Sequence, residues 1–266
     1  MFELSTRESQ LKAFDRLLTI MDELRAQCPW DRKQTIESLR HLTIEETFEL
    51  SDAIMDQDLE EVKNELGDIL LHIVFYAKIG SEKQSFDIAS VIDGLCEKLI
   101  RRHPHIYGDT IANDEEAVKQ NWEKIKLSEK GNKNVLGGVP RSLPAMIKAM
   151  RIQEKAKGAG FDWEEKHQVW DKVEEEMQEF KEEINGKAED INKERATGEF
   201  GDLLFSLINY ARFNDINPEE ALEKTNKKFI HRFQYLEQVV KDKGKKIEEM
   251  TLAEMDVYWN EAKEKG

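Results

Sequence analysis

The amino-acid sequence predicts an all-α fold, and three observations support this prediction. Five prolines and fourteen glycines in 266 residues leave long stretches without helix breakers. The residues in these stretches are mostly Glu, Lys, Leu, Ala and Ile, a composition that favours helices. The two halves of the chain also share one sequence pattern, which indicates a helical unit that occurs twice. A chain of this length can bury a sizeable core without disulfide bonds.

Composition excludes several classes of partner. The 55 acidic residues outnumber the 40 basic residues and give a formal net charge of -15, which disfavours nucleic acid and anionic membranes. The two cysteines, Cys28 and Cys96, are too few for a disulfide framework and fit a reducing compartment. No segment approaches the length and apolarity of a membrane span or a signal peptide. We therefore expect a cytoplasmic protein with no membrane or nucleic-acid partner.

The first half of the chain is expected to form one helical domain over residues 11–126. Its blocks are, in order, Cys28-Pro-Trp-Asp31, Glu45-Glu46-Thr-Phe-Glu49, Glu65-Leu-Gly-Asp68, Lys98-Leu-Ile-Arg-Arg102 and Trp122. Residues 69–77, which follow the Gly-Asp pair, are apolar on nearly all sides of a helix. This pattern predicts a buried central helix among about five helices, with its acidic first turn drawn towards the interior.

The second half repeats these blocks and is expected to form a second domain over residues 141–264. The corresponding blocks are Gly160-Phe-Asp-Trp163, Glu175-Glu176-Met-Gln-Glu179, Glu199-Phe-Gly-Asp202, Lys228-Phe-Ile-His-Arg232 and Trp259. Residues 127–140, which are rich in Gly, Asn, Lys and Ser, are the expected linker. The offset between the halves grows from Glu46/Glu176 to Glu65/Glu199, which places a small insertion around residues 185–193.

Each half contains four acidic residues that we expect to converge. Residues three apart on a helix share a face, so two such helices packed antiparallel would bring four carboxylates together. Their mutual repulsion calls for a cation, and all-oxygen ligands suit Mg²⁺ or Mn²⁺. A lone E-x-x-E usually marks a solvated helix surface; the signal here is the repeated combination. The predicted metal ligands are Glu46, Glu49, Glu65 and Asp68 in the first half, and Glu176, Glu179, Glu199 and Asp202 in the second.

Basic residues beside the second acidic set indicate a polyphosphate ligand. Lys172 and Arg195 lie one helical turn before Glu176 and Glu199, so they should point to the same side as the ligands. A metal flanked by Lys and Arg is a usual environment for phosphate oxygens. Further along the chain lie Asn226, Lys228 and Arg232. The first half has Leu42, Glu61 and Cys96 at the positions of Lys172, Arg195 and Asn226, so the second half is predicted to be the better polyphosphate site.

Taken together, these motifs resemble those of the MazG nucleoside triphosphate pyrophosphohydrolase family over nearly the whole chain. The resemblance rests on the blocks above and on Arg101-Arg-His-Pro-His105 with Tyr107-Gly108. It implies two tandem MazG-like helical domains whose helices pair into bundles in a homodimer. It also implies Mg²⁺-dependent hydrolysis of an NTP or dNTP, such as ATP, to the nucleoside monophosphate and diphosphate.

The resemblance further implies roles for residues of the second half. Glu176, Glu179, Glu199 and Asp202 match the metal ligands. The nucleotide-binding positions match Lys172, Arg195, Asn226, Lys228, Arg232 and Trp259. We expect a metal-bound water to attack the α-phosphorus, with Glu176 and Glu199 holding the catalytic metal and Glu175 accepting the proton. Arg195, Lys228 and Arg232 would stabilise charge on the departing diphosphate.

Two other functions compete with this hypothesis. A di-iron carboxylate bundle requires two Glu-x-x-His motifs, whereas the sequence contains one, Glu164 to His167, outside the acidic repeat. This disfavours iron chemistry. The second alternative is a nucleotide-sensing helical adaptor that binds an NTP without turnover, and kinetics alone separates it from an enzyme.

Overall fold

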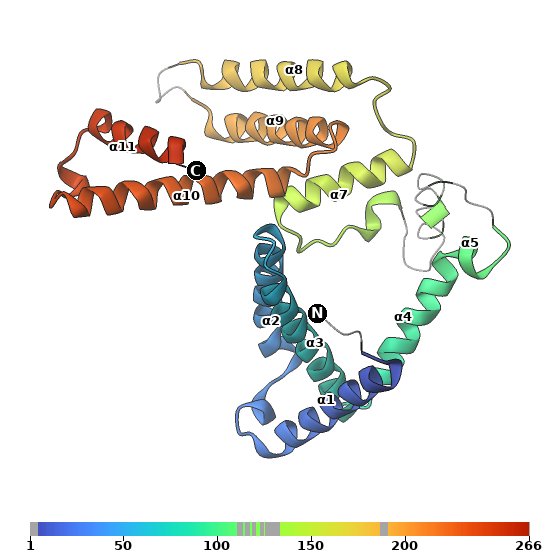
Figure 1. The fold of residues 1–266 in the computed structure, drawn as a ribbon. Helices are drawn as coiled ribbons and strands as arrows, with labels where there is room; N and C mark the ends of the chain where they lie inside the picture. Colours follow the sequence, from blue (N-terminus) through green and yellow to red (C-terminus); the bar gives the residue numbers. More distant parts are fainter. Residues whose placement is uncertain are drawn as a thin grey trace. The chain divides into compact units, whose positions relative to one another are not determined.

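The computed structural model describes residues 5–110, 114, 118, 121, 122, 125, 134–186 and 191–265. Within these residues the regular secondary structure is helical and contains no strand, so the all-α prediction is confirmed (Figure 1). The chain divides into two compact units, Met1–Ala112 and Asn113–Gly266. Residues 113–126, assigned to the first domain from the sequence, fall in the second unit, and residues 127–133 of the expected linker lie outside the described ranges.

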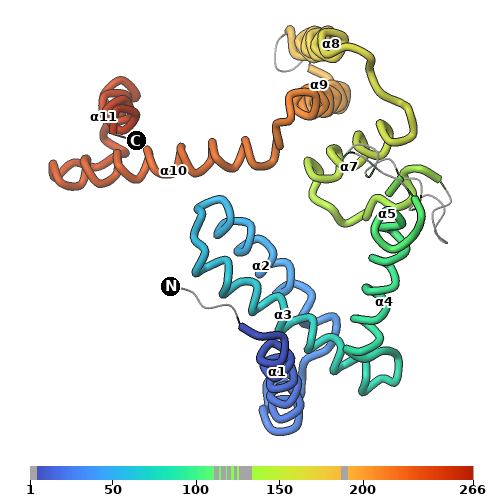
Figure 2. The backbone as a smooth tube through the Cα atoms, turned by 45° about the vertical axis from the view of Figure 1, so that its right-hand side comes forward, coloured from blue at the N-terminus to red at the C-terminus, as the bar shows by residue number. Residues whose placement is uncertain are grey.

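The first unit is built around a two-helix hairpin. Its elements are α1 (Arg7–Gln27), a short 3-10 helix (Asp31–Lys33), α2 (Ile36–Met55), α3 (Leu59–Glu82), α4 (Ile88–Arg102) and α5 (Pro104–Tyr107). Helices α2 and α3 lie side by side and run antiparallel, and α1 packs against α3 (Figures 1 and 2). The three-residue connection after α2 ends at Asp58, whose carboxylate caps α3 by accepting from the backbone N–H groups of Glu60 and Glu61.

The core of the first unit joins these three helices. Its fully buried side chains come from α1, α2 and α3 and are Met21, Leu39, Val74, Phe75 and Ile79. Burial of the apolar run in α3 is nevertheless incomplete, because Leu70 and Ile73 are exposed. Helices α1 and α2 cover two sides of α3 and leave its third side open within this unit. The sequence-based expectation of burial on nearly all sides is therefore met only on the faces towards α1 and α2.

The second unit repeats the hairpin with different flanking helices. Its elements are a 3-10 helix (Val135–Gly138), α7 (Ala145–Gly158), α8 (Lys166–Ile184), α9 (Lys193–Phe213), α10 (Pro218–Asp242), a 3-10 helix (Ile247–Glu249) and α11 (Leu252–Lys265). Helices α8 and α9 pair antiparallel, and α7 packs on α9. In Figure 2, α10 extends away from the α8–α9 hairpin, and α11 folds back against α10.

Matching outer faces of α3 and α9 expose apolar side chains. These are Leu66, Leu70 and Ile73 on α3, and Phe200, Leu204 and Leu207 at the corresponding positions of α9. Rows of this kind are larger than the scattered apolar residues of an ordinary surface. No helix in the described ranges is both long enough and apolar enough to cross a membrane.

Candidate active site

A helix cap fixes the start of α9, the second helix of the α8–α9 hairpin. The side chain of Asn192 accepts hydrogen bonds from the backbone N–H groups of Glu194 (3.1 Å) and Arg195 (3.2 Å), which fixes the start of α9. Glu199 then follows about two turns along the helix. In the first unit Asp58 caps α3 in the same way, two turns before Glu65. The first acidic residue of each Glu-x-Gly-Asp block therefore lies at the same distance from its helix cap in both units.

Three carboxylates of the second unit meet between α8 and α9. One oxygen from each of Glu176, Glu179 and Glu199 lies within 4.8 Å of the others. Glu176 is buried, which is unusual for a glutamate. Burial, followed by the charges of Glu176 and Glu199, raises the pKa of Glu179 above its ordinary value. Asp202, the fourth predicted ligand, is outside this group of three.

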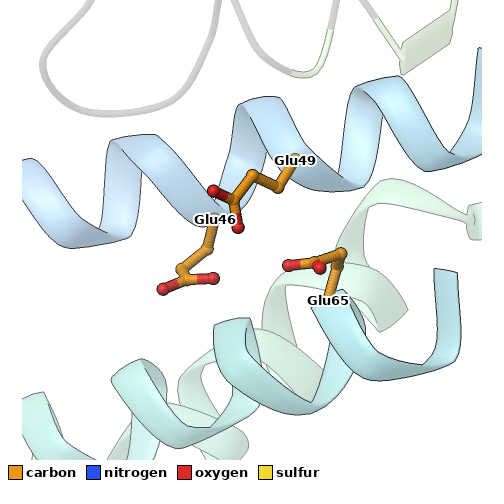
Figure 3. A group of neighbouring side chains, drawn as sticks. All are labelled: Glu46, Glu49 and Glu65. Atoms are coloured by element: carbon orange, nitrogen blue, oxygen red, sulfur yellow. The ribbon is translucent and has the colours of Figure 1, made fainter. Parts of the chain in front are cut away.

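The first unit holds an equivalent group, Glu46, Glu49 and Glu65, with oxygens within 4.8 Å of one another. Figure 3 shows Glu46 and Glu49 on one helix and Glu65 on the facing helix. Burial and the neighbouring acidic charges raise the pKa values of both Glu46 and Glu65. Asp68 lies outside the group but contributes to both shifts through its charge. The Oε2 atom of Glu65 is buried without a hydrogen-bond partner among the described residues.

The donor chemistry of both groups fits a divalent cation. Each offers three carboxylate oxygens from two facing helices, and oxygen ligands are those that Mg²⁺ and Mn²⁺ prefer. Negative charges this close are costly, as the raised pKa values show, and a dication would offset that cost. The unpartnered oxygen of Glu65 also lacks the hydrogen bond that a buried carboxylate normally makes. The structure thus brings together six of the eight predicted ligands.

Lys172 occupies one edge of the second carboxylate group. Its Nζ lies 2.7 Å from Oε1 of Glu176 and 2.8 Å from Oε1 of Glu175. These two contacts raise the pKa of Lys172 above its ordinary value. The contact also shows where Glu175 points: towards the lysine, beside the group of three and not within it.

Arg195 lies towards the other end of the group, one turn before Glu199 on α9. Its Nη2 is 2.6 Å from Oε1 of Glu183 on α8, which is one turn beyond Glu179. Glu183 is not among the residues predicted from the motifs, although its spacing of four from Glu179 places it on the same side of the helix. The corresponding positions in the first unit are Glu61 and Ala53, which cannot form this ion pair.

The remaining predicted nucleotide-binding residues lie on the α10–α11 pair. Asn226 donates to Oε2 of Glu223 (3.0 Å), and Lys228 is exposed on the same helix. The guanidinium of Arg232 lies 5.9 Å from the ring centre of Trp259, which also packs against Phe229. Among the residues described for the second unit, no hydrogen bond or ion pair joins these four predicted side chains to the carboxylate group. The acidic set thus lies on α8–α9, and a basic and aromatic set lies on α10–α11.

The two hairpins coincide with a known domain family. The family model of the MazG nucleotide pyrophosphohydrolase domain matches residues 34–107 and again residues 164–236, and each match contains one carboxylate group. A nucleoside triphosphate pyrophosphohydrolase/pyrophosphatase MazG from Thermotoga maritima is 44% identical over 254 residues, which cover 94% of this chain and 95% of that protein. A nucleoside triphosphate pyrophosphohydrolase from Escherichia coli K12 is 38% identical over 259 residues, covering 95% and 98% respectively.

Among solved structures, the crystal structure of a mazG-related protein from Thermotoga maritima aligns with 42% of this chain and 97% of its own. The sequence identity of that alignment is 28%, and its TM-score is 0.38. The family assignment rests on the two matches to the family model and on the relatives that align from end to end. This chain belongs to the MazG nucleotide pyrophosphohydrolase family.

Proposed function

We propose that the protein is a Mg²⁺-dependent nucleoside triphosphate pyrophosphohydrolase that works mainly through its second unit. The reaction converts an NTP or dNTP and water into the nucleoside monophosphate and diphosphate. The hydrolase class follows from the family and from the named relatives. The observation that favours the second unit is the position of Lys172 beside Glu176, because the first unit has Leu42 there.

The carboxylate group of the second unit is the proposed metal site. Glu176, Glu179 and Glu199 would hold Mg²⁺, with Asp202 completing the set predicted from the sequence. A bound divalent ion lowers the pKa of water and neutralises charge on a polyphosphate. The glutamates of the first unit, Glu46, Glu49 and Glu65, offer the same ligand chemistry and are proposed as a second metal site.

The protein's own side chains carry the remaining steps. The water oxygen forms a bond to the α-phosphorus while the bond to the α,β-bridging oxygen breaks, and the water proton passes to the carboxylate of Glu175. The electrons of the broken bond leave with the diphosphate, whose charge Arg195, Lys228 and Arg232 stabilise. Trp259 presents an aromatic ring beside Arg232 and would contact the base.

We also propose that the protein works as a cytoplasmic homodimer without a nucleic-acid partner. The outer faces of α3 and α9 expose equivalent rows of apolar side chains, and a second copy would bury them. Helices of two subunits would then complete the bundle around each hairpin. The excess of negative charge disfavours binding to nucleic acid.

Product analysis with matched variants tests the proposed reaction. The full chain, incubated with Mg²⁺ or Mn²⁺ and a panel of NTPs, dNTPs and NDPs, is expected to release diphosphate and a nucleoside monophosphate. The double variant Glu176→Gln/Glu199→Gln is expected to lose at least about 100-fold in kcat, whereas Glu46→Gln/Glu65→Gln retains most of the activity. Release of orthophosphate as the first product would contradict the reaction. Nucleotide binding without turnover would favour the sensing adaptor.

A further inference from the structure

Lys172 uses an oxygen that a metal ion would need. Its ammonium lies 2.7 Å from Oε1 of Glu176, and the Glu176 side chain is only 9% exposed, whereas that of Lys172 is 35% exposed. A divalent ion bound by the same carboxylate would lie a few ångströms from the ammonium. Like charges repel strongly at that separation where solvent is largely excluded. The ion pair and a metal ion therefore compete for Glu176.

The first unit provides an internal comparison, because it has the same three glutamates without this lysine. Leu42 occupies the position of Lys172 and packs against the core of α1, α2 and α3. Among the residues described in the first unit, no lysine or arginine forms an ion pair with Glu46, Glu49 or Glu65. Among the described residues of this unit, no positive charge therefore has to leave before a divalent ion binds there.

The partial exposure of Lys172 allows its side chain to move away from Glu176 towards solvent. Its other partner, Glu175, is more than half exposed and holds the lysine at the rim of the carboxylate group. From this rim a lysine side chain can swing towards solvent on its flexible four-carbon stem. Phosphate oxygens arriving at the metal site would offer it a stronger partner than a carboxylate that the metal also binds.

We propose that Lys172 couples the two ligands of the second unit: it occupies Glu176 until a polyphosphate draws it away, so that the metal ion and the nucleotide bind together. The inference rests on the proposed function of this site. The coupling gives the two metal sites of the chain different affinities for a divalent ion in the absence of nucleotide. The first unit takes up a divalent ion from solution without a nucleotide, whereas the second unit binds the ion weakly until the nucleotide arrives.

The direct test measures Mn²⁺ alone, in the full chain, by the loss of its free-ion electron paramagnetic resonance signal. The two Lys172 variants are made in a Glu46→Gln/Glu65→Gln background, so that the measured Mn²⁺ binding comes from the second unit alone. Lys172→Met is expected to tighten Mn²⁺ binding about tenfold, the scale of one lost charge-assisted hydrogen bond. Lys172→Arg keeps the charge and is expected to retain the weak binding.

A matched control removes the same charge from the other side of the helix. Lys181 lies nine residues further along α8, about 180° around its axis from Lys172, and is exposed. Lys181→Met is expected to leave the dissociation constant for Mn²⁺ within about twofold of the parent, because a solvated charge is largely screened. Circular dichroism confirms that each variant retains its helical content.

A second measurement adds a non-hydrolysable α,β-methylene analogue of ATP. In the parent, the analogue is expected to tighten Mn²⁺ binding at least about tenfold. In Lys172→Met this gain disappears and the analogue itself binds more weakly. Tighter metal binding combined with weaker nucleotide binding is a pair of changes that a purely structural role of Lys172 does not produce.

An unchanged Mn²⁺ dissociation constant in Lys172→Met, or a gain from the analogue equal to that of the parent, overturns the proposal. The arm with Mn²⁺ alone contains no nucleotide and no turnover. Its outcome is therefore independent of whether NTPs are hydrolysed, and failure of the proposed reaction is distinguished from failure of the coupling.

Discussion

Arg195 on α9 and Glu183 on α8 form an ion pair with Nη2 and Oε1 2.6 Å apart, beside the carboxylate group of the second unit. The arginine side chain is 68% exposed, so the pair contributes at most about 1 kcal/mol to stability. We propose that this exposed guanidinium, beside the proposed metal site, binds a phosphate. Mutation of each residue in turn can therefore distinguish the role of the guanidinium from that of the ion pair.

We predict that Arg195→Gln lowers kcat/KM for NTP hydrolysis about tenfold or more, the effect of losing one charged contact, with little change in the free energy of unfolding. Glu183→Gln breaks the same ion pair but keeps the guanidinium. It is expected to leave kcat/KM within about threefold of the wild type. Equal losses of activity in the two variants would show that Arg195 acts only by joining α8 to α9.

The second prediction concerns Arg25, which ties three segments of the first unit together. Its side chain is 12% exposed, and it donates to Glu82 on α3 through Nε (2.9 Å) and Nη2 (2.8 Å). Through Nη1 it also donates to the backbone carbonyls of Asp31 and Gln34. The hydrogen bonds between the two side chains raise the pKa of Arg25 and lower that of Glu82. The arginine thus fixes the loop after α1 against α3.

Arg25→Met is expected to lower the free energy of unfolding of the first unit by about 2–3 kcal/mol, because it leaves a carboxylate and two carbonyls without their donor. Urea titration followed by circular dichroism measures the change. Lys78→Met is the matched control, since Lys78 pairs with Asp22 between the same two helices but at a more exposed position. That variant is expected to lose about 1 kcal/mol or less, and an equal loss in both would contradict the role of Arg25.

The sequence predicted the carboxylate groups well because their signals are local. Spacing along a helix fixes which residues share a face, and a cap such as Asn192 fixes where the helix begins. Asp68 and Asp202 show the limit of spacing. Each lies about 60° around its helix from the glutamate three residues earlier, and its side chain is one carbon shorter, so it falls outside the group.

The positions of α10 and α11 depend on tertiary packing, which spacing within a helix does not encode. The spacing of Lys228 and Arg232 predicts that they share a helix, and both lie on α10. Their distance from Glu199, however, depends on the direction in which α10 extends from the α8–α9 hairpin. The open face of α3 has a similar cause. An apolar run predicts burial without identifying what covers it, and within one unit Leu70 and Ile73 remain exposed.

The third prediction follows from the raised pKa of Glu46. A carboxyl whose pKa is higher in the folded than in the unfolded protein favours folding at low pH, and this contribution is lost as the pH rises through the folded-state pKa. At neutral pH the ionised Glu46 therefore destabilises the metal-free protein. Glu46→Gln is expected to raise the Tm of the first unit by about 2–4 °C at neutral pH.

The effect of pH and metal checks the cause of that stabilisation. The difference in Tm should shrink as the pH falls through the raised folded-state pKa of Glu46 towards the ordinary value of a glutamate carboxyl, about 4.5, because the wild-type carboxyl then gains a proton. Saturating Mg²⁺ should raise the Tm of the wild type more than that of Glu46→Gln. Glu60→Gln, at an exposed position on α3, is the control. It should neither raise the Tm of the metal-free protein nor alter the rise in Tm that Mg²⁺ causes. A lower Tm in metal-free Glu46→Gln would contradict the prediction.

The last prediction concerns the outer faces of α3 and α9. Leu70 and Leu204 occupy equivalent positions in these faces, and a glutamate there would have to be buried without a partner if a second copy packed against it. We expect Leu70→Glu and Leu204→Glu each to weaken the proposed dimer, and the double variant to elute with the mass of one chain in size-exclusion chromatography with light scattering. Leu59→Glu, at the exposed start of α3, should leave the mass unchanged. Because both leucine side chains are exposed within their units, helical content should be retained. A double variant that keeps twice the chain mass would exclude these faces as the dimer interface.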